Sequence, residues 1–246
     1  FGIDYLRDVW YSTSYLLDRK QSMNGCAKKR FENYKQQPLE FVFDKSFTGK
    51  LSQFGLDPNH RTPSGIKAAI IREKGTNGER EMAYMLYLAG FDVKDVTMTD
   101  LISGRETLED INMVVYCGGF SNSDVLGSAK GWAGSFLFNP KAKAALDNFY
   151  AREDTLSLGV CNGCQLMMEL GLITPEDKKK GKMLHNDSHK FESNFLGVTV
   201  PMNRSVMFGS LSGSKLGIWV AHGEGKFSLP YPEDHYNVVL KYSYDE

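Results

Sequence analysis

The chain has 246 residues, of which 41% are hydrophobic and 12% aromatic, enough to bury one good core and a small second lobe. Its 29 basic and 30 acidic residues leave a net charge of -1, which provides no field for attracting a phosphate backbone or an anionic membrane. We therefore expect neither nucleic acid nor a membrane as a partner. Apolar runs are far shorter than the ~20 residues of a bilayer span. Four cysteines in a chain of this length form no dense disulfide framework, which favours a cytoplasmic protein.

The first part of the chain predicts helices followed by a linker. Two amphipathic helices before Pro38 are indicated by apolar residues at helical spacing, namely Ile3, Leu6, Trp10 and Leu17, then Met23, Ala27, Phe31 and Tyr34. Prolines and glycines then predict a linker that ends near Gly65. We place a domain boundary there, so that residues 1–64 form a helical tail with a linker and residues 65–246 form a second domain. Because the chain begins at Phe1 inside an expected helix and stops at Glu246 straight after a strand-like run, we expect a fragment, truncated at its C-terminus.

After Gly65, strands and helices alternate. The expected strands cover residues 66–72, 93–98, 113–117 and 156–160. One expected helix begins after Gly78, and two others cover residues 141–152 and 162–170. This alternation predicts an α/β fold with a mostly parallel sheet and helices on both faces. From Phe191 onward, apolar residues predict short strands of a second sheet portion or an antiparallel edge, namely Val198, Val200, Val206, Phe208, Ile218 and Val220. Sites in such folds lie beyond the carboxyl ends of strands, where Gly118-Gly119 and Cys161 both fall.

Cys161 lies where an expected strand turns sharply into a helix, with Gly159 and Gly163 two residues to either side. This is the cysteine version of a nucleophile elbow, in which the glycines permit a tight turn that raises the nucleophile above the sheet. The helix N-terminus then directs its free N–H groups towards the sulfur and favours the thiolate. The backbone N–H of Asn162 becomes a donor for a developing oxyanion.

A nucleophilic thiol needs a base, and five histidines are available. His222 ends an expected strand, and Glu224 follows two residues later, so on an extended backbone both side chains point to one face about 6.6 Å apart. Glu224 can then hold one imidazole nitrogen while the other faces Cys161. Alone, such a pair is more often a surface pair. The other histidines lie in the linker or in polar turns without an obvious orienting carboxylate, and they are His60, His185, His189 and His235.

Two segments, Gly159-Val160-Cys161-Asn162-Gly163-Cys164-Gln165 and Ala221-His222-Gly223-Glu224-Gly225-Lys226, resemble the class I glutamine amidotransferase domain. More narrowly, residues 117–127 and 191–193 resemble the glutaminase domain fused to large single-chain phosphoribosylformylglycinamidine synthases of purine biosynthesis. The likeness continues upstream through residues 63–67 and 77–83, and residues 13–18 resemble the tail of the synthetase portion. It covers nearly the whole chain.

The resemblance implies that Cys161 attacks the carboxamide carbon of glutamine, that His222 transfers protons and that Glu224 orients His222. It further implies that the backbone N–H groups of Gly119 and Asn162 hold the oxyanion. The residues implied to hold the amino-acid end of glutamine are Gln165, Phe191 and Glu192. Glutamate and ammonia result, and the rest of the synthetase chain uses the ammonia. We expect ATP and magnesium in that missing portion, and neither a cofactor nor a metal in this fragment.

The sequence departs from the expected family pattern at several positions. Arginines are usual where this chain has Lys190, Asn194 and Lys226, and lysine keeps the charge but loses the planar fork, whereas asparagine keeps neither. Asn122 and Ser123, after Gly119, also differ. The anchoring of glutamine is therefore less well defined by the resemblance than the trio of Cys161, His222 and Glu224.

Other interpretations stay open. Cys161 and Cys164 have the spacing of a redox or zinc pair, although no second such pair is present, and Cys26 and Cys117 fit structural roles. A cysteine peptidase or another hydrolase on the same fold would share the elbow and His222, and would differ by acting on a bond other than the amide of free glutamine. A catalytically silent regulatory module would not react with an electrophile that mimics glutamine.

Overall fold

The computed structural model describes residues 2–60 and 62–244, which divide into two compact units. One unit comprises residues 48–183, and the other comprises residues 1–47 together with 184–246. This division differs from the predicted boundary at Gly65, which stays a prediction. The residues at which we expected a fragment to begin and stop, Phe1 and Glu246, lie outside the described residues. In the part of the chain that is described, no helix is long and apolar enough to cross a membrane.

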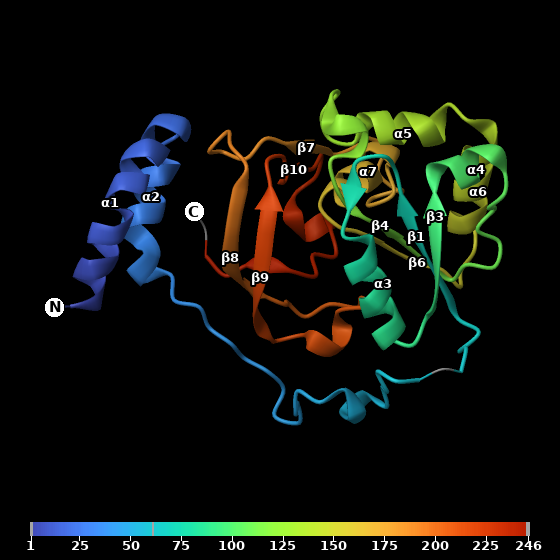
Figure 1. Cartoon of the computed structure of the whole chain (residues 1–246), viewed down its shortest axis with the longest axis horizontal. Helices are drawn as coiled ribbons and strands as arrows, with labels where there is room; N and C mark the ends of the chain where they lie inside the picture. Colours follow the sequence, from blue (N-terminus) through green and yellow to red (C-terminus); the bar gives the residue numbers. More distant parts are fainter. Residues whose placement is uncertain (1, 61, 245–246) are drawn as a thin grey trace. The chain divides into compact units, whose positions relative to one another are not determined.

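A parallel four-stranded sheet in the order β3-β1-β4-β6 forms the centre of the first unit (Figure 1). Its strands are β1 (Lys67–Arg72), β3 (Asp92–Thr97), β4 (Met113–Tyr116) and β6 (Leu156–Gly159). All four residues of β4 are buried, which is the pattern of a central strand covered on both faces. A small antiparallel pair, β2 (Thr76–Asn77) and β5 (Gly118–Gly119), lies beyond the carboxyl ends of β1 and β4.

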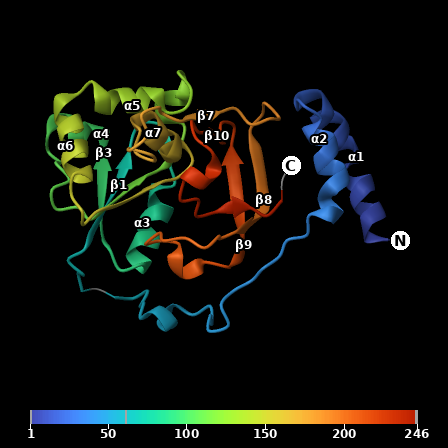
Figure 2. The ribbon, with the colours of Figure 1, turned by 180° about the vertical axis from the view of Figure 1, so that it is seen from behind.

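Helices lie on both faces of this sheet, as expected. They are α3 (Glu79–Leu88), α4 (Met98–Ser103), α5 (Lys130–Leu137), α6 (Pro140–Tyr150) and α7 (Asn162–Leu170). The chain moves from β1 outward to β3 and then back across β1 to β4, so right-handed crossovers put α3 on one face and the later helices on the other. Figures 1 and 2, which view the sheet from opposite sides, show α3 and α6 on these two faces. The main core lies under α4 to α7 and includes Trp132, Phe136, Phe149 and Leu166.

The second unit contains an antiparallel sheet in the order β11-β8-β9 and two N-terminal helices. The bounds are β8 (Glu192–Thr199), β9 (Lys215–His222), β11 (Lys241–Tyr242), α1 (Ile3–Gln21) and α2 (Cys26–Asn33). The helices pack through aromatic rings, because Tyr15 stacks on Phe31 at 4.4 Å and the Arg7 guanidinium lies 3.7 Å from the Tyr34 ring. The short strand β10 (Lys226–Ser228) follows β9, and β7 (Lys182–Leu184) spans the boundary between the units.

The predicted elements agree with the structure to within two residues at most ends. The two helices before Pro38, the four parallel strands and the helices near residues 141 and 162 are all present. The antiparallel strands after Phe191 are present as well, although Val206 and Phe208, which we expected in strands, lie in a loop. Helices α4 and α5 were not predicted, and neither were the single-turn 3-10 helices, which are Tyr34–Gln36, Leu51–Phe54, Ser121–Asp124, Gly209–Leu211 and Glu233–His235.

Candidate active site

Cys161 lies between β6 and α7 and is exposed. Its backbone is in a rarely occupied region, with φ 52° and ψ -109°. Both flanking glycines are required by close backbone approach: a Cβ on Gly159 would lie 2.6 Å from the Gly163 carbonyl oxygen, and one on Gly163 would lie 2.1 Å from the Tyr116 carbonyl oxygen. The chain therefore makes the predicted elbow, which presents the sulfur at the N-terminus of α7.

The expected oxyanion donors lie on two neighbouring segments of the same unit. A Cβ on Gly118 would lie 3.3 Å from the Cys161 Cβ, so the Gly118-Gly119 strand passes directly beside the elbow. Gly119 has φ +114° and is paired with Thr76. Asn162 is the first residue of α7, so its backbone N–H has no intrahelical acceptor. These positions suit donors for an oxyanion formed at Cys161, a role that stays a prediction.

Asn162 and Gln165 form a buried polar network beneath the elbow. The Asn162 Oδ1 accepts a hydrogen bond of 3.0 Å from the Ser121 backbone N–H, and its Nδ2 donates one of 2.8 Å to the Gln165 Oε1. Both side chains are at least nine-tenths buried. The network ties the segment after β5 to the first turn of α7, and thereby fixes the two backbone segments that flank Cys161.

The other two cysteines of this unit, Cys117 and Cys164, are less exposed than Cys161, and their pKa values are raised. Burial raises the pKa of the Cys164 thiol to about 11, and the nearby Cys161 adds to this effect. Burial likewise raises the pKa of Cys117 to about 11. No disulfide links the described cysteines. Neither Cys117 nor Cys164 is suited to act as a thiolate near neutral pH.

Alkylation at pH 8 should follow this difference. The thiolate is the reactive form, so a thiol with a pKa near 11 is ionised at roughly one part in a thousand at pH 8. We expect iodoacetamide to modify Cys161 well before Cys164 or Cys117, as peptide mapping by mass spectrometry would reveal. Labelling of Cys164 should increase as the pH rises towards 11. Equal labelling of Cys161 and Cys164 at pH 8 would contradict the assignment.

His222 is the last residue of β9, in the other unit. Burial lowers its pKa below 6.5, although Glu192 raises it in part. Glu192 lies directly opposite His222 in the antiparallel pair of β8 and β9. The Nδ1 of His222 lies 2.9 Å from the Oδ1 of Asn186, a residue that the sequence analysis did not identify. Because this pKa lies below 7, the ring is mostly uncharged at pH 7, as a proton acceptor requires.

Glu224, expected to hold a nitrogen of His222, lies in the turn after β9 with its side chain 18% exposed. Its Oε1 is 3.5 Å from the Nε2 of His185, whereas the contact described at the His222 Nδ1 is made by Asn186. The role of Glu224 therefore stays a prediction. Asn186 is found only in three dimensions, since it precedes His222 by 36 residues and has no distinctive local motif.

The residues expected to hold glutamine fall in different surroundings. Gln165 is buried beside Asn162, whereas Phe191 is 47% exposed. Glu192 is engaged by Arg30 of α2, whose Nη2 donates a hydrogen bond of 2.6 Å to Oε1. Asn194, where the family pattern has an arginine, has its Nδ2 3.5 Å from the other carboxylate oxygen. The guanidinium beside Glu192 is thus supplied by a helix 162 residues away in the sequence.

The other departures from the family pattern also have defined partners. Lys190 pairs with Asp18 of α1 at 2.5 Å, and Lys226 pairs with Asp187 at 2.7 Å. Asn122 and Ser123 both have left-handed backbone conformations, with φ of 52° and 58°. These residues shape the segment that follows Gly119.

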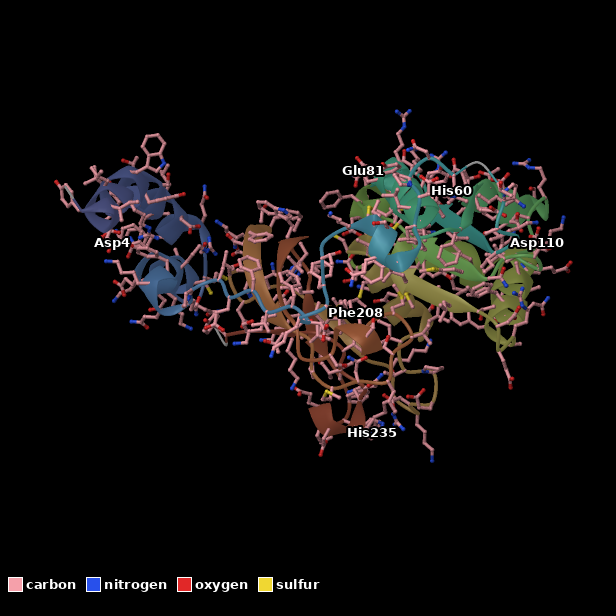
Figure 3. All side chains as sticks on the ribbon, turned by 90° about the horizontal axis from the view of Figure 1, so that it is seen from below. Asp4, His60, Glu81, Asp110, Phe208 and His235 are labelled. Atoms are coloured by element: carbon pink, nitrogen blue, oxygen red, sulfur yellow. The ribbon has the colours of Figure 1, made fainter. Side chains whose placement is uncertain are left out.

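Two histidines that the sequence set aside are labelled in Figure 3. His60 stacks on Tyr87 at 4.1 Å, and His235 stacks on Tyr231 at 4.6 Å. Both are thus involved in aromatic packing. Within residues 2–60 and 62–244, no group of three His, Cys, Asp or Glu side chains could hold a metal ion.

Comparison with known proteins shows the family of this chain. Residues 65–245 match the CobB/CobQ-like glutamine amidotransferase domain, and the chain belongs to this family. Phosphoribosylformylglycinamidine synthase from Homo sapiens is 39% identical over 247 residues, which cover 93% of this chain and 18% of that protein. The probable phosphoribosylformylglycinamidine synthase from Caenorhabditis elegans is 48% identical over 227 residues, which cover 92% of this chain and 16% of that protein.

A solved structure shares the fold. The structure of PurLQS from Thermotoga maritima superimposes with a TM-score of 0.58 and 27% sequence identity, covering 73% of this chain and 76% of that chain. The chain spans about a sixth of the length of the curated relatives it matches, because the matched part is 16% of the Caenorhabditis elegans relative and 16% of the Arabidopsis thaliana relative. That relative, a probable phosphoribosylformylglycinamidine synthase assigned to the chloroplast or mitochondrion, is 40% identical over 237 residues, 92% of this chain.

Proposed function

We propose that this chain is the glutamine-hydrolysing part of a phosphoribosylformylglycinamidine synthase. The observation that carries the proposal is the exposed Cys161 at the N-terminus of α7, held by an elbow that admits only glycine at positions 159 and 163. The relatives that bear this name are matched over about nine-tenths of the chain. Glutamine is the substrate, and the rest of the synthetase chain is the partner that receives ammonia.

In the proposed reaction, His222 takes the thiol proton of Cys161, the sulfur adds to the carboxamide carbon of glutamine, and the carbonyl electron pair moves onto the oxygen. Backbone N–H groups of Gly119 and Asn162 stabilise this oxyanion. The C–N bond then breaks as His222 delivers a proton to the departing ammonia, which leaves a thioester on Cys161. His222 next takes a proton from water, whose oxygen attacks the thioester and releases glutamate. Glu224 supplies the carboxylate that supports the protonated ring.

The ammonia joins an ATP-dependent step in the remainder of the synthase, which forms an amidine from a ribonucleotide amide, with ATP and magnesium bound there. No cofactor is assigned to this chain. We place the protein in the cytoplasm because its described cysteines are all free, the condition expected in a reducing compartment. The chloroplastic or mitochondrial relative marks the alternative compartment.

A diazo-ketone analogue of glutamine tests the proposal directly. We expect it to alkylate Cys161, excess glutamine to protect this residue, and Cys164 to stay unmodified, as shown by digestion and mass spectrometry. Labelling of Cys161 by iodoacetamide in a parallel sample without the analogue provides the control for thiol accessibility.

A chain in which iodoacetamide modifies Cys161 but the analogue does not would be a peptidase, another hydrolase or a silent module. Hydrolysis of a peptide library, measured beside release of glutamate from free glutamine, separates these cases. Adduct formation on Cys164 instead would overturn the role of Cys161.

A further inference from the structure

The Asn186 side chain is buried, with 8% of the residue exposed, and it lies against the turn that follows β9. We propose that Asn186 is the positioning residue that holds His222 in the tautomer with its proton on Nδ1, so that Nε2 keeps the lone pair that accepts a proton. This inference rests on the proposed function, in which His222 is the base. It deepens that function by naming the group that selects the reactive nitrogen.

Three backbone groups fix the orientation of the Asn186 amide independently of the imidazole. Its Nδ2 donates to the carbonyl oxygens of His222 at 2.7 Å and of Lys190 at 3.2 Å. Its Oδ1 accepts a hydrogen bond of 3.2 Å from the Gly225 backbone N–H. A flipped amide would direct NH₂ at an N–H donor and oxygen at two carbonyl oxygens. The acceptor end therefore faces the ring.

This orientation determines the tautomer of His222. The Asn186 Oδ1 lies 2.9 Å from the ring Nδ1 and has no proton to donate. A favourable hydrogen bond thus requires the proton on Nδ1, and in the neutral ring this leaves Nε2 unprotonated. The reverse tautomer would place two lone pairs in contact at a buried site.

The ring is also held by the turn around it. Asn186 donates its backbone N–H to the Gly223 carbonyl oxygen at 2.9 Å, so it binds the residues on both sides of Glu224. A Cβ on Gly225 would lie 2.2 Å from the Nδ1 and Cε1 of His222, so the turn packs directly against the imidazole. Side chain and backbone together leave the ring little freedom to rotate.

An amide orients the ring without adding charge, as the asparagine of Cys-His-Asn hydrolases does, in contrast to the carboxylate of the Ser-His-Asp triad. Glu192 lies across the strand pair from His222, Glu224 directs an oxygen towards His185, and Asn186 makes the contact described at Nδ1. Asn186 therefore selects the tautomer, and Glu192 favours the charged form of the ring.

Nuclear magnetic resonance of the 246-residue chain labelled with ¹⁵N and ¹³C at histidine tests the proposal. The His222 signals are assigned by their loss in His222→Gln, and the long-range ¹⁵N–¹H pattern at pH 8 reports which nitrogen carries the proton. We expect the Nδ1–H form in the wild-type chain and a mixture of tautomers in Asn186→Ala.

Two variants serve as controls. Asn203→Ala removes an amide that likewise holds a loop, through bonds to Pro201 and Ser212, but does not touch His222. Glu224→Ala removes the neighbouring carboxylate. Both should keep the Nδ1–H tautomer. An Nε2–H ring in the wild type overturns the proposal even if Asn186→Ala does not fold, and so does an Asn186→Ala spectrum identical to the wild type or a loss of the Nδ1–H form in Glu224→Ala.

Activity in the full-length synthase gives a second readout. Asn186→Ala should lower kcat for glutamine hydrolysis on the order of 10²-fold, with a smaller change in KM, because the ring no longer holds the productive tautomer. An unchanged kcat overturns the catalytic significance of the contact. Failure of the tautomer assignment can be distinguished from failure of the proposed function, because the tautomer is measured without glutamine. Absence of the glutamine-analogue adduct on Cys161 would reject the proposed function and leave the tautomer assignment standing.

Discussion

Replacement of Cys161 by alanine should abolish glutamine hydrolysis, with a fall in kcat of roughly 10⁴-fold or more, because no other group can form the thioester. The side chain is exposed at its turn, so its loss leaves no cavity in the core. The fold should therefore persist, as circular dichroism would show. Activity is measured as glutamate released from glutamine by the full-length synthase.

The matched control is Cys164→Ala, one helical turn further along α7. This thiol is half-buried, and burial raises its pKa to about 11, so it stays protonated near neutral pH. We expect the variant to keep glutaminase activity to within a few-fold. Equal losses in the two variants would be incompatible with Cys161 as the nucleophile and would return attention to a paired role for the two cysteines.

Gly163→Ala should be among the most destabilising single substitutions in the unit of residues 48–183. The added Cβ would lie 2.1 Å from the Tyr116 carbonyl oxygen, a backbone atom of the central strand β4 that cannot move aside cheaply. Forced overpacking of this kind costs roughly 3 kcal/mol, which corresponds to a fall of about 6 to 12 °C in the melting temperature of a domain of this size. Differential scanning calorimetry measures the change.

Gly134→Ala is the control, because Gly134 lies inside another helix, α5, and its Cβ would meet only the Phe138 ring at 3.7 Å. Alanine is the better helix former by about 1 kcal/mol, so this variant should melt slightly higher than the wild type. A Gly163→Ala chain that melts with the wild type would show that α7 does not approach β4 as closely as described.

The α/β architecture was predictable because its determinants are local. The alternating strands and helices have distinct hydrophobic periods, and glycines mark the turns between them. The short helix α4 was not predicted, although Thr97 and Asp100 form a capping box at its start. Its six residues are too few to display a helical period. The loop of Val206 and Phe208 was mistaken for strand because isolated apolar residues alternate there without any pairing partner.

The elbow could also be predicted in detail, since a strand, a cysteine and its two flanking glycines are adjacent in the chain. The surroundings of His222 could not be predicted in this way. The predicted Glu224 contact assumed an extended backbone beyond His222. In the structure β9 ends at His222 and the chain turns through Gly223 and Gly225, and the role of Glu224 stays a prediction. The turn is held by Asn186, which a local pattern cannot connect to a ring 36 residues later.

The sequence by itself determined the fold class, the family and the position of the candidate nucleophile, because each depends on residues that are close together in the chain. Only the tertiary structure showed that Asn186 contacts the His222 ring and that Arg30 pairs with Glu192 across 162 residues. Hydrogen bonds and ion pairs of this kind depend on side-chain positions set by packing between distant segments. Their partners carry no periodicity or spacing by which a linear sequence could reveal them.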